Sequence, residues 1–296
     1  MTQNTRRMLS IQAEPGRQKN AKALKRVLFY SFLVVVALTV IIPFLWIFSN
    51  GVRPNDEIGK FTDLSVSTFV PQQFTMGNYV RMFEQLDMVK IIFNTLLVAL
   101  SVTLGSLLIN SMTAYAFSRI LFFGKNLIFM IFISMLVLPI EILIITLYLT
   151  VSKLGLADSY LSLILPFLAT PFGIFFMRQF FAGIPKDLDE AAVIDGCNHY
   201  NIFLRILLPL SKTPLLTLGL LVFMQQWDSF IVPVTLINSE SKMVLQVALT
   251  RLSMGLYMTD YGVLYAGVSL SVIPIAIIYI IFQKHIVQSI STVGIK

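Results

Sequence analysis

The chain has 296 residues, of which 56% are apolar and 12% are charged, and its mean hydropathy is +0.81. That composition excludes an ordinary soluble domain and indicates a chain that lies in a lipid bilayer. The formal net charge of +7 does not indicate nucleic-acid binding, because the basic residues flank apolar segments and do not alternate with aromatics along a polar face.

The first 26 residues carry seven lysines and arginines against one acid, Glu14, and show no sustained apolar period. We therefore expect residues 1–26 to form a disordered basic arm. Residues 27–48 then run through 22 uncharged positions, which is long enough for a helix to cross a bilayer. A secretory signal peptide would have a shorter apolar core followed by small residues, so a first transmembrane helix is predicted here.

Residues 50–90 mix both signs of charge with two prolines and are expected to form a loop outside the membrane. The apolar stretch that follows predicts a second transmembrane helix at 91–115, closed by a short basic connection. A third helix is predicted over 126–150, interrupted by Pro139.

The second half of the chain alternates apolar stretches with one polar island. The stretch at 229–260 leaves two possibilities, because its apolar start could extend a helix or dip back into the membrane before an outside loop. The predicted segments are a fourth helix at 159–181, the polar island at 183–208, a fifth helix at 209–230, a sixth helix at 261–283 and a tail at 286–296.

Lysines and arginines concentrate on one side of this topology. Fifteen of them lie in the arm, the connection holding Arg119 and Lys125, the polar island and the tail, whereas seven lie on the opposite side. Because positively charged loops stay in the cytoplasm, both termini and the island should be cytoplasmic. The single cysteine, Cys197, excludes an internal disulfide. The sequence thus predicts an all-α polytopic membrane protein with six transmembrane helices over residues 27–285.

The polar island has the pattern of a helix, a turn and a second helix. Pro185 suits the first turn of a helix, and acidic residues follow it at the positive end of that helix. Ala191 and Ala192 leave part of the helix nearly bare, so that another protein's backbone could approach closely. Gly196 can adopt the left-handed conformation that ends a helix. Pro209 marks the entry to the next apolar segment.

Several residue types of this island stand at fixed spacings, namely Glu190, Ala191, Ala192, Gly196, Ile206, Leu208 and Pro209. Together they resemble the EAA signature of permease subunits of ABC importers. Residues 113–125, the WDSF run from Trp227 and the closing STVGIK are similar to the sugar-importer branch, which includes the maltose permeases. The resemblance extends over about four fifths of the chain.

In that family the island is the cytoplasmic loop that docks into a cleft of the ATP-hydrolysing subunit. The resemblance therefore implies a docking role for Glu190, Ala191, Ala192, Asp195, Gly196, Ile206, Leu208 and Pro209. It also implies four kinds of partner in a bacterial or archaeal plasma membrane: a second, distinct permease subunit, two ATPase subunits, an extracytoplasmic substrate-binding protein and a carbohydrate.

No cofactor is expected on this chain, and ATP with Mg is expected on the partner ATPase. The two Gly-Lys pairs of the chain lack the earlier glycine of a phosphate-binding loop. His199 and His285 have no companions at ligand spacing, so no metal site is predicted. The chain is therefore not expected to be an enzyme.

Polar side chains at membrane depth are candidates for a substrate pathway. Glu141 lies 16 residues past Lys125, or about 24 Å along a straight helix, and could line the pathway or fix two helices together as a bonded carboxyl. Asn94 and Asn110 are further candidates, although hydrogen bonding between helices is the simpler interpretation.

A polar group ends the predicted fifth helix. Gln225, Gln226, Trp227 and Asp228 combine amides, an indole and a carboxylate, which suit the hydroxyls and ring faces of a sugar. Tryptophan and aspartate at a bilayer boundary are also common interfacial anchors, so both interpretations stay open.

These features favour one half of the translocation pathway of a binding-protein-dependent sugar importer that works by alternating access. The alternative is a secondary transporter driven by an ion gradient, with Glu141 or Asp228 as the proton carrier. That class is expected to contain internal repeats, and residues 27–152 and 159–283 show no convincing repeat of each other.

Overall fold

The computed structural model describes residues 14–60, 66–253 and 260–293, and within these ranges every regular element is helical, which confirms the all-α class. The α-helices are α2 (Glu14–Gly51), α3 (Val66–Phe69), α4 (Gly77–Gln85), α5 (Met88–Arg119), α6 (Lys125–Ser134), α7 (Ile140–Lys153), α8 (Tyr160–Ile164), α9 (Pro171–Gly183), α10 (Asp187–Ile194), α11 (His199–Ile202), α12 (Leu208–Leu210), α13 (Lys212–Trp227), α14 (Ile231–Leu236), α15 (Leu245–Ser253) and α16 (Tyr261–Val293). The tighter or wider turns are η1 (Met135–Val137), η2 (Leu165–Phe167), η3 (Phe203–Leu207) and η4 (Glu240–Lys242).

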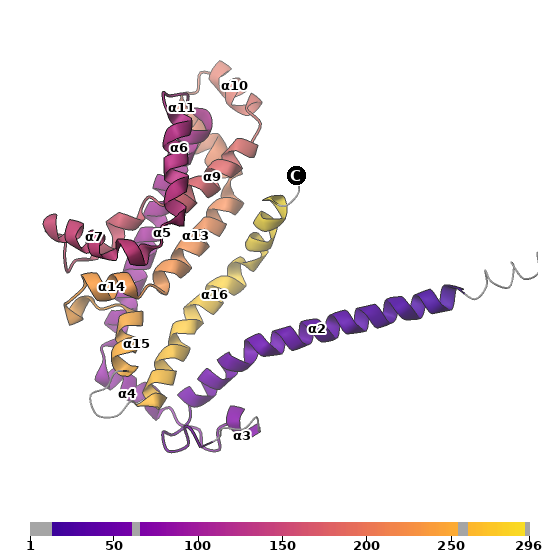
Figure 1. Ribbon diagram of the computed structural model, residues 1–296, viewed down its shortest axis with the longest axis vertical. Helices are drawn as coiled ribbons and strands as arrows, with labels where there is room; N and C mark the ends of the chain where they lie inside the picture. The colour runs from indigo at the N-terminus through magenta and orange to yellow at the C-terminus, as the bar shows by residue number, and fades with distance from the viewer. Residues whose placement is uncertain (1–13, 61–65, 254–259, 294–296) are drawn as a thin grey trace, which may run out of the picture.

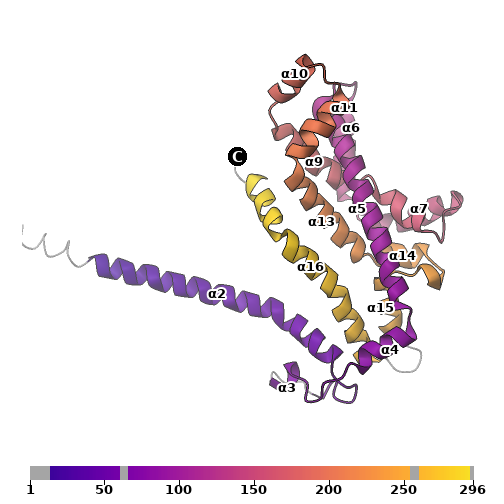
Figure 2. The ribbon, with the colours of Figure 1, turned by 180° about the vertical axis from the view of Figure 1, so that it is seen from behind.

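Helix α5 runs along the bundle from one end to the other, behind its neighbours in Figure 1 and in front of them in Figure 2. It packs along α9 and α13, and α13 packs in turn against α16. The buried side of α5 carries Val98, Val102 and Ala114 at helical spacing, and these small or β-branched side chains let neighbouring helices approach closely. Through these contacts α5 connects the two ends of the bundle, and we call it the central helix.

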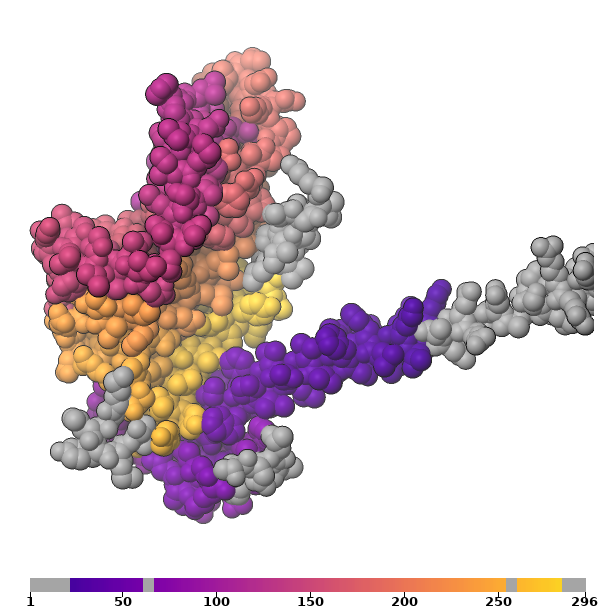
Figure 3. Space-filling model, viewed as in Figure 1, coloured from indigo at the N-terminus to yellow at the C-terminus, as the bar shows by residue number. Residues whose placement is uncertain are grey.

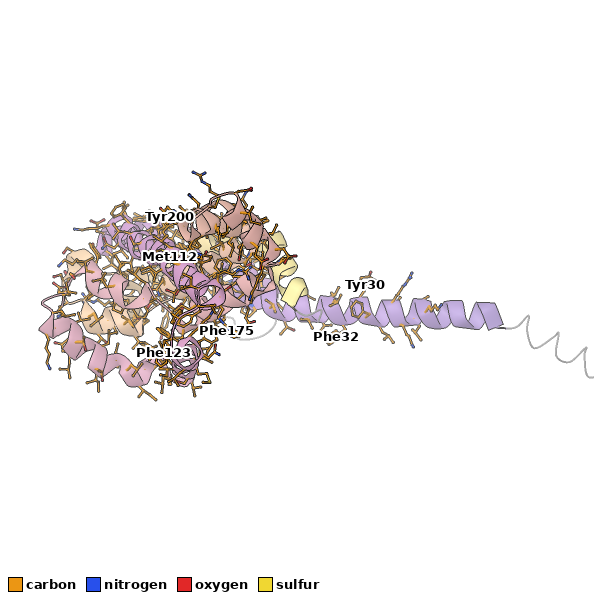
Figure 4. The ribbon with its side chains drawn as sticks, turned by 90° about the horizontal axis from the view of Figure 1, so that it is seen from above. Tyr30, Phe32, Met112, Phe123, Phe175 and Tyr200 are labelled. Carbon is orange, nitrogen blue, oxygen red and sulfur yellow. The ribbon has the colours of Figure 1, made fainter. Side chains whose placement is uncertain are left out.

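Helix α2 leaves the bundle and projects to one side (Figures 1 and 3). Only its C-terminal part is held, where Trp46 meets Tyr265 of α16 edge to face at 5.1 Å between ring centroids. Farther out, Tyr30 and Phe32 are each 64% exposed and extend into open space (Figure 4). A long apolar helix without cover needs lipid or another protein around it.

The expectation of a disordered arm is wrong for residues 14–26. Helix α2 begins at Glu14 and runs through this basic stretch without a break, whereas residues 1–13 lie outside the described part of the chain. Lysine, arginine, glutamine, alanine and leucine are all good helix formers, so an apolar helix that starts at Val27 can be propagated backward through them.

The predicted third helix is two helices with a sharp bend between them. The pair α6 with η1 and the helix α7 meet at an angle of 108°. Pro139 has no backbone N–H and holds the preceding Leu138 in an extended conformation, with φ −85° and ψ 112°, so the helix cannot continue. The straight-helix depth inferred for Glu141 is therefore wrong.

The fourth and fifth predicted helices are also interrupted. The fourth consists of α8, η2 and α9, and Thr170 begins α9 by accepting a hydrogen bond from the N–H of Gly173 at 3.1 Å. The fifth begins at Lys212, after an 80° bend that separates α13 from the helical turns before it. The sixth helix, α16, runs on to Val293 and so takes in most of the predicted tail.

The segment at 229–260 does not continue α13. The short helix α14 starts anew after Asp228 and packs against α7 and α8. Part of the expected outside loop is helical as α15, which packs against α5 and α16.

Within the residues that the structure describes, four helical stretches are long and apolar enough to cross a membrane, and counting each bent pair as one crossing gives up to six. The four are Lys22–Gly51, Met88–Arg119, Tyr160–Gly183 and Tyr261–Gln283. The chain is therefore a multi-pass membrane protein, and the two bent pairs decide the number of crossings.

Candidate functional site

The polar island forms α10, a turn and α11 at one end of the bundle (Figures 1 and 2). Helix α10 ends where Gly196 adopts a positive φ of 82°. The N–H of Gly196 donates to the carbonyl of Val193 at 3.0 Å, and the N–H of Cys197 donates to that of Ala192 at 2.8 Å. These two bonds form a Schellman motif, so the predicted sequence of helix, turn and helix is confirmed.

Helix α10 has one face toward the bundle and one face away from it. Ala192 is 6% exposed and lies in the core, and Asp189 forms an ion pair with Arg119 at 2.6 Å. Glu190, Ala191 and Ile194 lie on the opposite face and are exposed. Ile194 follows Glu190 by four residues and Ala191 by three, so it neighbours both on the helix surface. We call these three residues the docking surface.

The docking role predicted for Ala192 needs correction. Its side chain packs inside this chain, so a partner protein has no access to it in this structure. A helix turns through about 100° per residue, so adjacent alanines point in different directions and only Ala191 remains exposed.

The sequence analysis missed the apolar side chains around the docking surface. Ile194 is 86% exposed, Val193 is 56% exposed and Tyr200, labelled in Figure 4, is 66% exposed. Large apolar side chains that remain uncovered at the tip of a bundle are typical of a protein interface. For Val193 and Ile194 the available signal was their helical spacing from Glu190, but apolar residues in an apolar chain are first assigned to the core.

The second half of the motif packs back onto the bundle. Ile206 and Leu208 are half-buried against the core, whereas Pro209 and Asp195 are exposed. The hydroxyl of Tyr115 on α5 lies 3.1 Å from Nδ1 of His199, which ties α11 to the central helix. Ile206 and Leu208 therefore help to position the island, and their contact with a partner stays a prediction.

Asn94 and Asn110 join helices inside the chain. Asn94 is 2% exposed, its Nδ2 donates to the carbonyls of Ser241 and Met243 at 3.1 and 2.9 Å, and its Oδ1 accepts from the Tyr160 hydroxyl at 2.7 Å. The predicted pathway role is wrong for this state of the chain, because the amide is buried and bonded on both sides.

Asn110 has the same kind of role at the break before α9. Its Oδ1 accepts from the N–H of Thr170 at 2.9 Å and its Nδ2 donates to Oγ of Ser106 at 2.6 Å, with no solvent exposure. A Cβ added to Gly173 would lie 2.4 Å from this amide nitrogen, which explains the glycine. The interhelical interpretation is correct for both asparagines.

Glu141 stands in the first turn of α7, directly after the bend. Its side chain is exposed and makes no hydrogen bond or ion pair with any residue that the structure describes. The alternative in which a bonded Glu141 carboxyl fixes two helices together is therefore not observed among the described residues.

The four polar residues that end α13 separate in the structure. Trp227 is 1% exposed, stacks on Phe223 and donates its indole N–H to the carbonyl of Ser271 at 3.0 Å. It can neither stack on a sugar nor anchor the chain at a bilayer surface, so both interpretations are wrong for it. Gln225 and Asp228 are exposed and Gln226 is half-buried.

A groove with a volume of about 540 Å³ opens between α5, α13 and α16. Its wall is almost wholly apolar, and we call it the apolar groove. It is lined by Leu100, Thr103, Leu107, Lys212, Leu215, Leu216, Gly219, Leu220, Phe223, Ile278 and Phe282. Such a surface suits a helix or a lipid chain and offers few hydrogen-bonding groups to a sugar.

Three comparisons with known proteins agree with this architecture. Residues 111–292 match the family described as binding-protein-dependent transport system inner membrane component. An arabinooligosaccharide transport system permease of Halalkalibacterium halodurans is 30% identical over 281 residues, covering 95% of this chain and 99% of that protein. A diacetylchitobiose uptake system permease of Streptomyces coelicolor is 29% identical, covering 88% and 86%.

The fold is similar to that of a chain in the crystal structure of a bacterial ABC transporter involved in the import of the acidic polysaccharide alginate. The TM-score is 0.80 at 23% identity, and the alignment covers 89% of this chain and 97% of that one. Because the family match spans more than half of the sequence and the Halalkalibacterium relative aligns almost end to end, this chain belongs to the inner-membrane components of binding-protein-dependent transport systems.

Proposed function

We propose that the chain is a permease subunit of an ATP-driven importer of carbohydrates and forms half of its translocation pathway. The relatives named above and a galactooligosaccharide permease of Bacillus subtilis, 30% identical over 277 residues, are named for the transport of oligosaccharides. These names support a carbohydrate substrate, and the extracytoplasmic binding protein is expected to make the first selection among sugars.

The single observation that carries the coupling role is the docking surface on α10. Ile194 offers a large apolar anchor, Ala191 leaves room for close approach, and Glu190 adds a charge beside them. An exposed apolar side chain flanked by polar groups suits insertion into a cleft of a partner. We assign that cleft to each of two ATPase subunits, which bind ATP and Mg.

A second permease subunit completes the pathway in this proposal. Helix α2 and the apolar groove are two uncovered apolar surfaces on one membrane chain. Both would be covered in a complex with a second, distinct permease in the plasma membrane of a bacterium or archaeon. Gln225, Gln226, Asp228 and Glu141 remain candidates for contact with the sugar.

In this proposal each bent pair is one crossing, so the chain crosses six times and both termini lie on the same side. The distribution of lysine and arginine assigns that side to the cytoplasm. The chain allows a direct test because Cys197 is its single cysteine. In a Cys197→Ser background, a cysteine in place of Ile194 should react with an impermeant maleimide in inside-out vesicles only. Reaction in right-side-out vesicles would contradict the topology and the docking role together.

Transport itself is tested with the complete complex in liposomes. The vesicles contain ATP, and the binding protein is added outside them together with one sugar at a time. The sugars offered are arabinooligosaccharides, galactooligosaccharides, diacetylchitobiose and alginate oligomers. We expect uptake that vanadate abolishes and an uncoupler leaves unchanged. Uptake that an uncoupler abolishes and vanadate leaves unchanged would support the ion-gradient alternative, which no observation on this chain favours.

A further inference from the structure

A buried ion pair connects α10 to the central helix. Arg119 is the last residue of α5, and its Nε lies 2.6 Å from Oδ2 of Asp189 in the first turn of α10. The two side chains are 5% and 17% exposed. The same guanidinium donates through Nη2 to the carbonyl of Ile184 at 2.7 Å, at the end of α9. One side chain thus fixes both the entry to α10 and its first turn.

Helix α10 has few other attachments within the described chain. Ala192 is its one buried residue, and no helix packs extensively along it. By contrast, α11 is held both by Tyr115 and by the burial of Ile202. The orientation of α10 therefore depends on Arg119 and Asp189 more than on packing.

The pair differs from the exposed ion pairs of this chain. Arg251 and Glu240 meet at 3.1 Å, but their side chains are 46% and 85% exposed, so water screens the attraction. In the pair on α10 the second oxygen of Asp189 is buried and has no hydrogen-bond partner among the described residues. Removal of Arg119 alone would leave a buried carboxylate without a counter-charge, which is strongly unfavourable.

Helix α5 also holds the opposite end of the bundle. There Asn94 binds the carbonyl of Met243, and the hydroxyl of Thr95 accepts the N–H of Leu245 at the start of α15. If α10 moves and Arg119 passes that movement to α5, the other end of α5 would move the segment that leads into α15, because Asn94 and Thr95 are bonded to it.

We propose that Arg119 and Asp189 are positioning residues that fix the docking surface to α5 and transmit its movement to the membrane helices. The inference rests on the proposed function for its transport consequence, but the positioning itself is measurable on the chain alone.

The test measures the distance between α10 and α5 in the full-length chain. Spin labels are attached to cysteines replacing Val193 and Met112 in a Cys197→Ser background. The parent should give one narrow distance distribution, and Asp189→Asn should give a broad one. In the complete complex, Asp189→Asn should lower the stimulation of ATP hydrolysis by the binding protein with arabinooligosaccharides roughly tenfold, while the ATPase still co-purifies.

Asp187→Asn is the matched control, because it removes the same charge from the same helix turn at an exposed position that is not paired with Arg119. Asp187→Asn should keep the narrow distance distribution. Asp189→Glu, which retains a carboxylate, should give a distribution nearly as narrow as that of the parent. A narrow distribution in Asp189→Asn, or equal broadening in Asp187→Asn, would overturn the inference.

If a single variant fails to insert, the double variant Arg119→Gln with Asp189→Asn leaves no uncompensated charge and serves in its place. It too must give the broad distribution. Failure of the wild-type complex to transport would count against the proposed function alone, because the distance measurement does not require transport.

Discussion

At the scale of single residues, Gly196 is required within this chain for its backbone conformation. Its φ is 82°, yet a Cβ built there would meet nothing within 4 Å among the described residues. A β-branched residue in this conformation costs about 1–2 kcal/mol, whereas asparagine tolerates it. We expect Gly196→Val to reduce co-purification of the ATPase and Gly196→Asn to retain most of it. Equal loss in both variants would point to a need for bare backbone at this position.

Asp158 organises the connection between α7 and α8. Its carboxylate accepts hydrogen bonds from the hydroxyl and N–H of Ser239 and from the N–H of Asn238, and it lies beside Lys242. These donors, with the Ser239 hydroxyl contributing most, hold the pKa of Asp158 well below its usual range.

A pH dependence follows from that lowered pKa. A carboxyl whose pKa is lower in the folded than in the unfolded chain stabilises the fold above its unfolded pKa of about 3.9, and this contribution is lost as the pH falls below that value. The unfolding temperature of the purified chain should therefore decrease as the pH is lowered below about 4. The decrease should be smaller in Asp158→Asn. Parallel pH profiles for the two proteins would contradict the assignment.

At the scale of elements, α5 organises its neighbours through polar groups as well as through packing. Asn94→Ala would leave the buried carbonyl of Met243 and the hydroxyl of Tyr160 without their partner, which costs about 1–3 kcal/mol for each unsatisfied group. We expect a lower unfolding temperature with unchanged apparent affinity for transported sugar. Weaker sugar affinity at unchanged stability would restore the pathway interpretation.

At the scale of the whole molecule, α2 is the feature that this chain alone cannot explain. Its apolar window of 18 residues has no buried position, although the helix is 38 residues long. In a Cys197→Ser background, a photoreactive group at Phe32 should therefore label the second permease subunit in the assembled complex. Labelling of this chain's own α13 or α16 would show instead that α2 folds back over the apolar groove.

The sequence alone predicted the helical class, the approximate position of each apolar segment and the turn at Gly196. These depend on local chemistry: the length of uncharged runs, the donor that Pro139 lacks and the conformations open to glycine. The resemblance of the polar island indicated the family before any contact was known. It could not separate Ala191 from Ala192, because the two residues are of the same type and adjacent, and the signature does not say which of them faces the bundle.

The tertiary structure decided which side chains remain available. Arg119, 70 positions before Asp189, turns one face of α10 inward and so leaves Ile194 outward. Ser271 accepts the indole N–H of Trp227 and removes that ring from any pathway. Contacts between residues far apart in the chain are set by how the helices pack together, and no local pattern encodes which residue on another helix will face a given side chain.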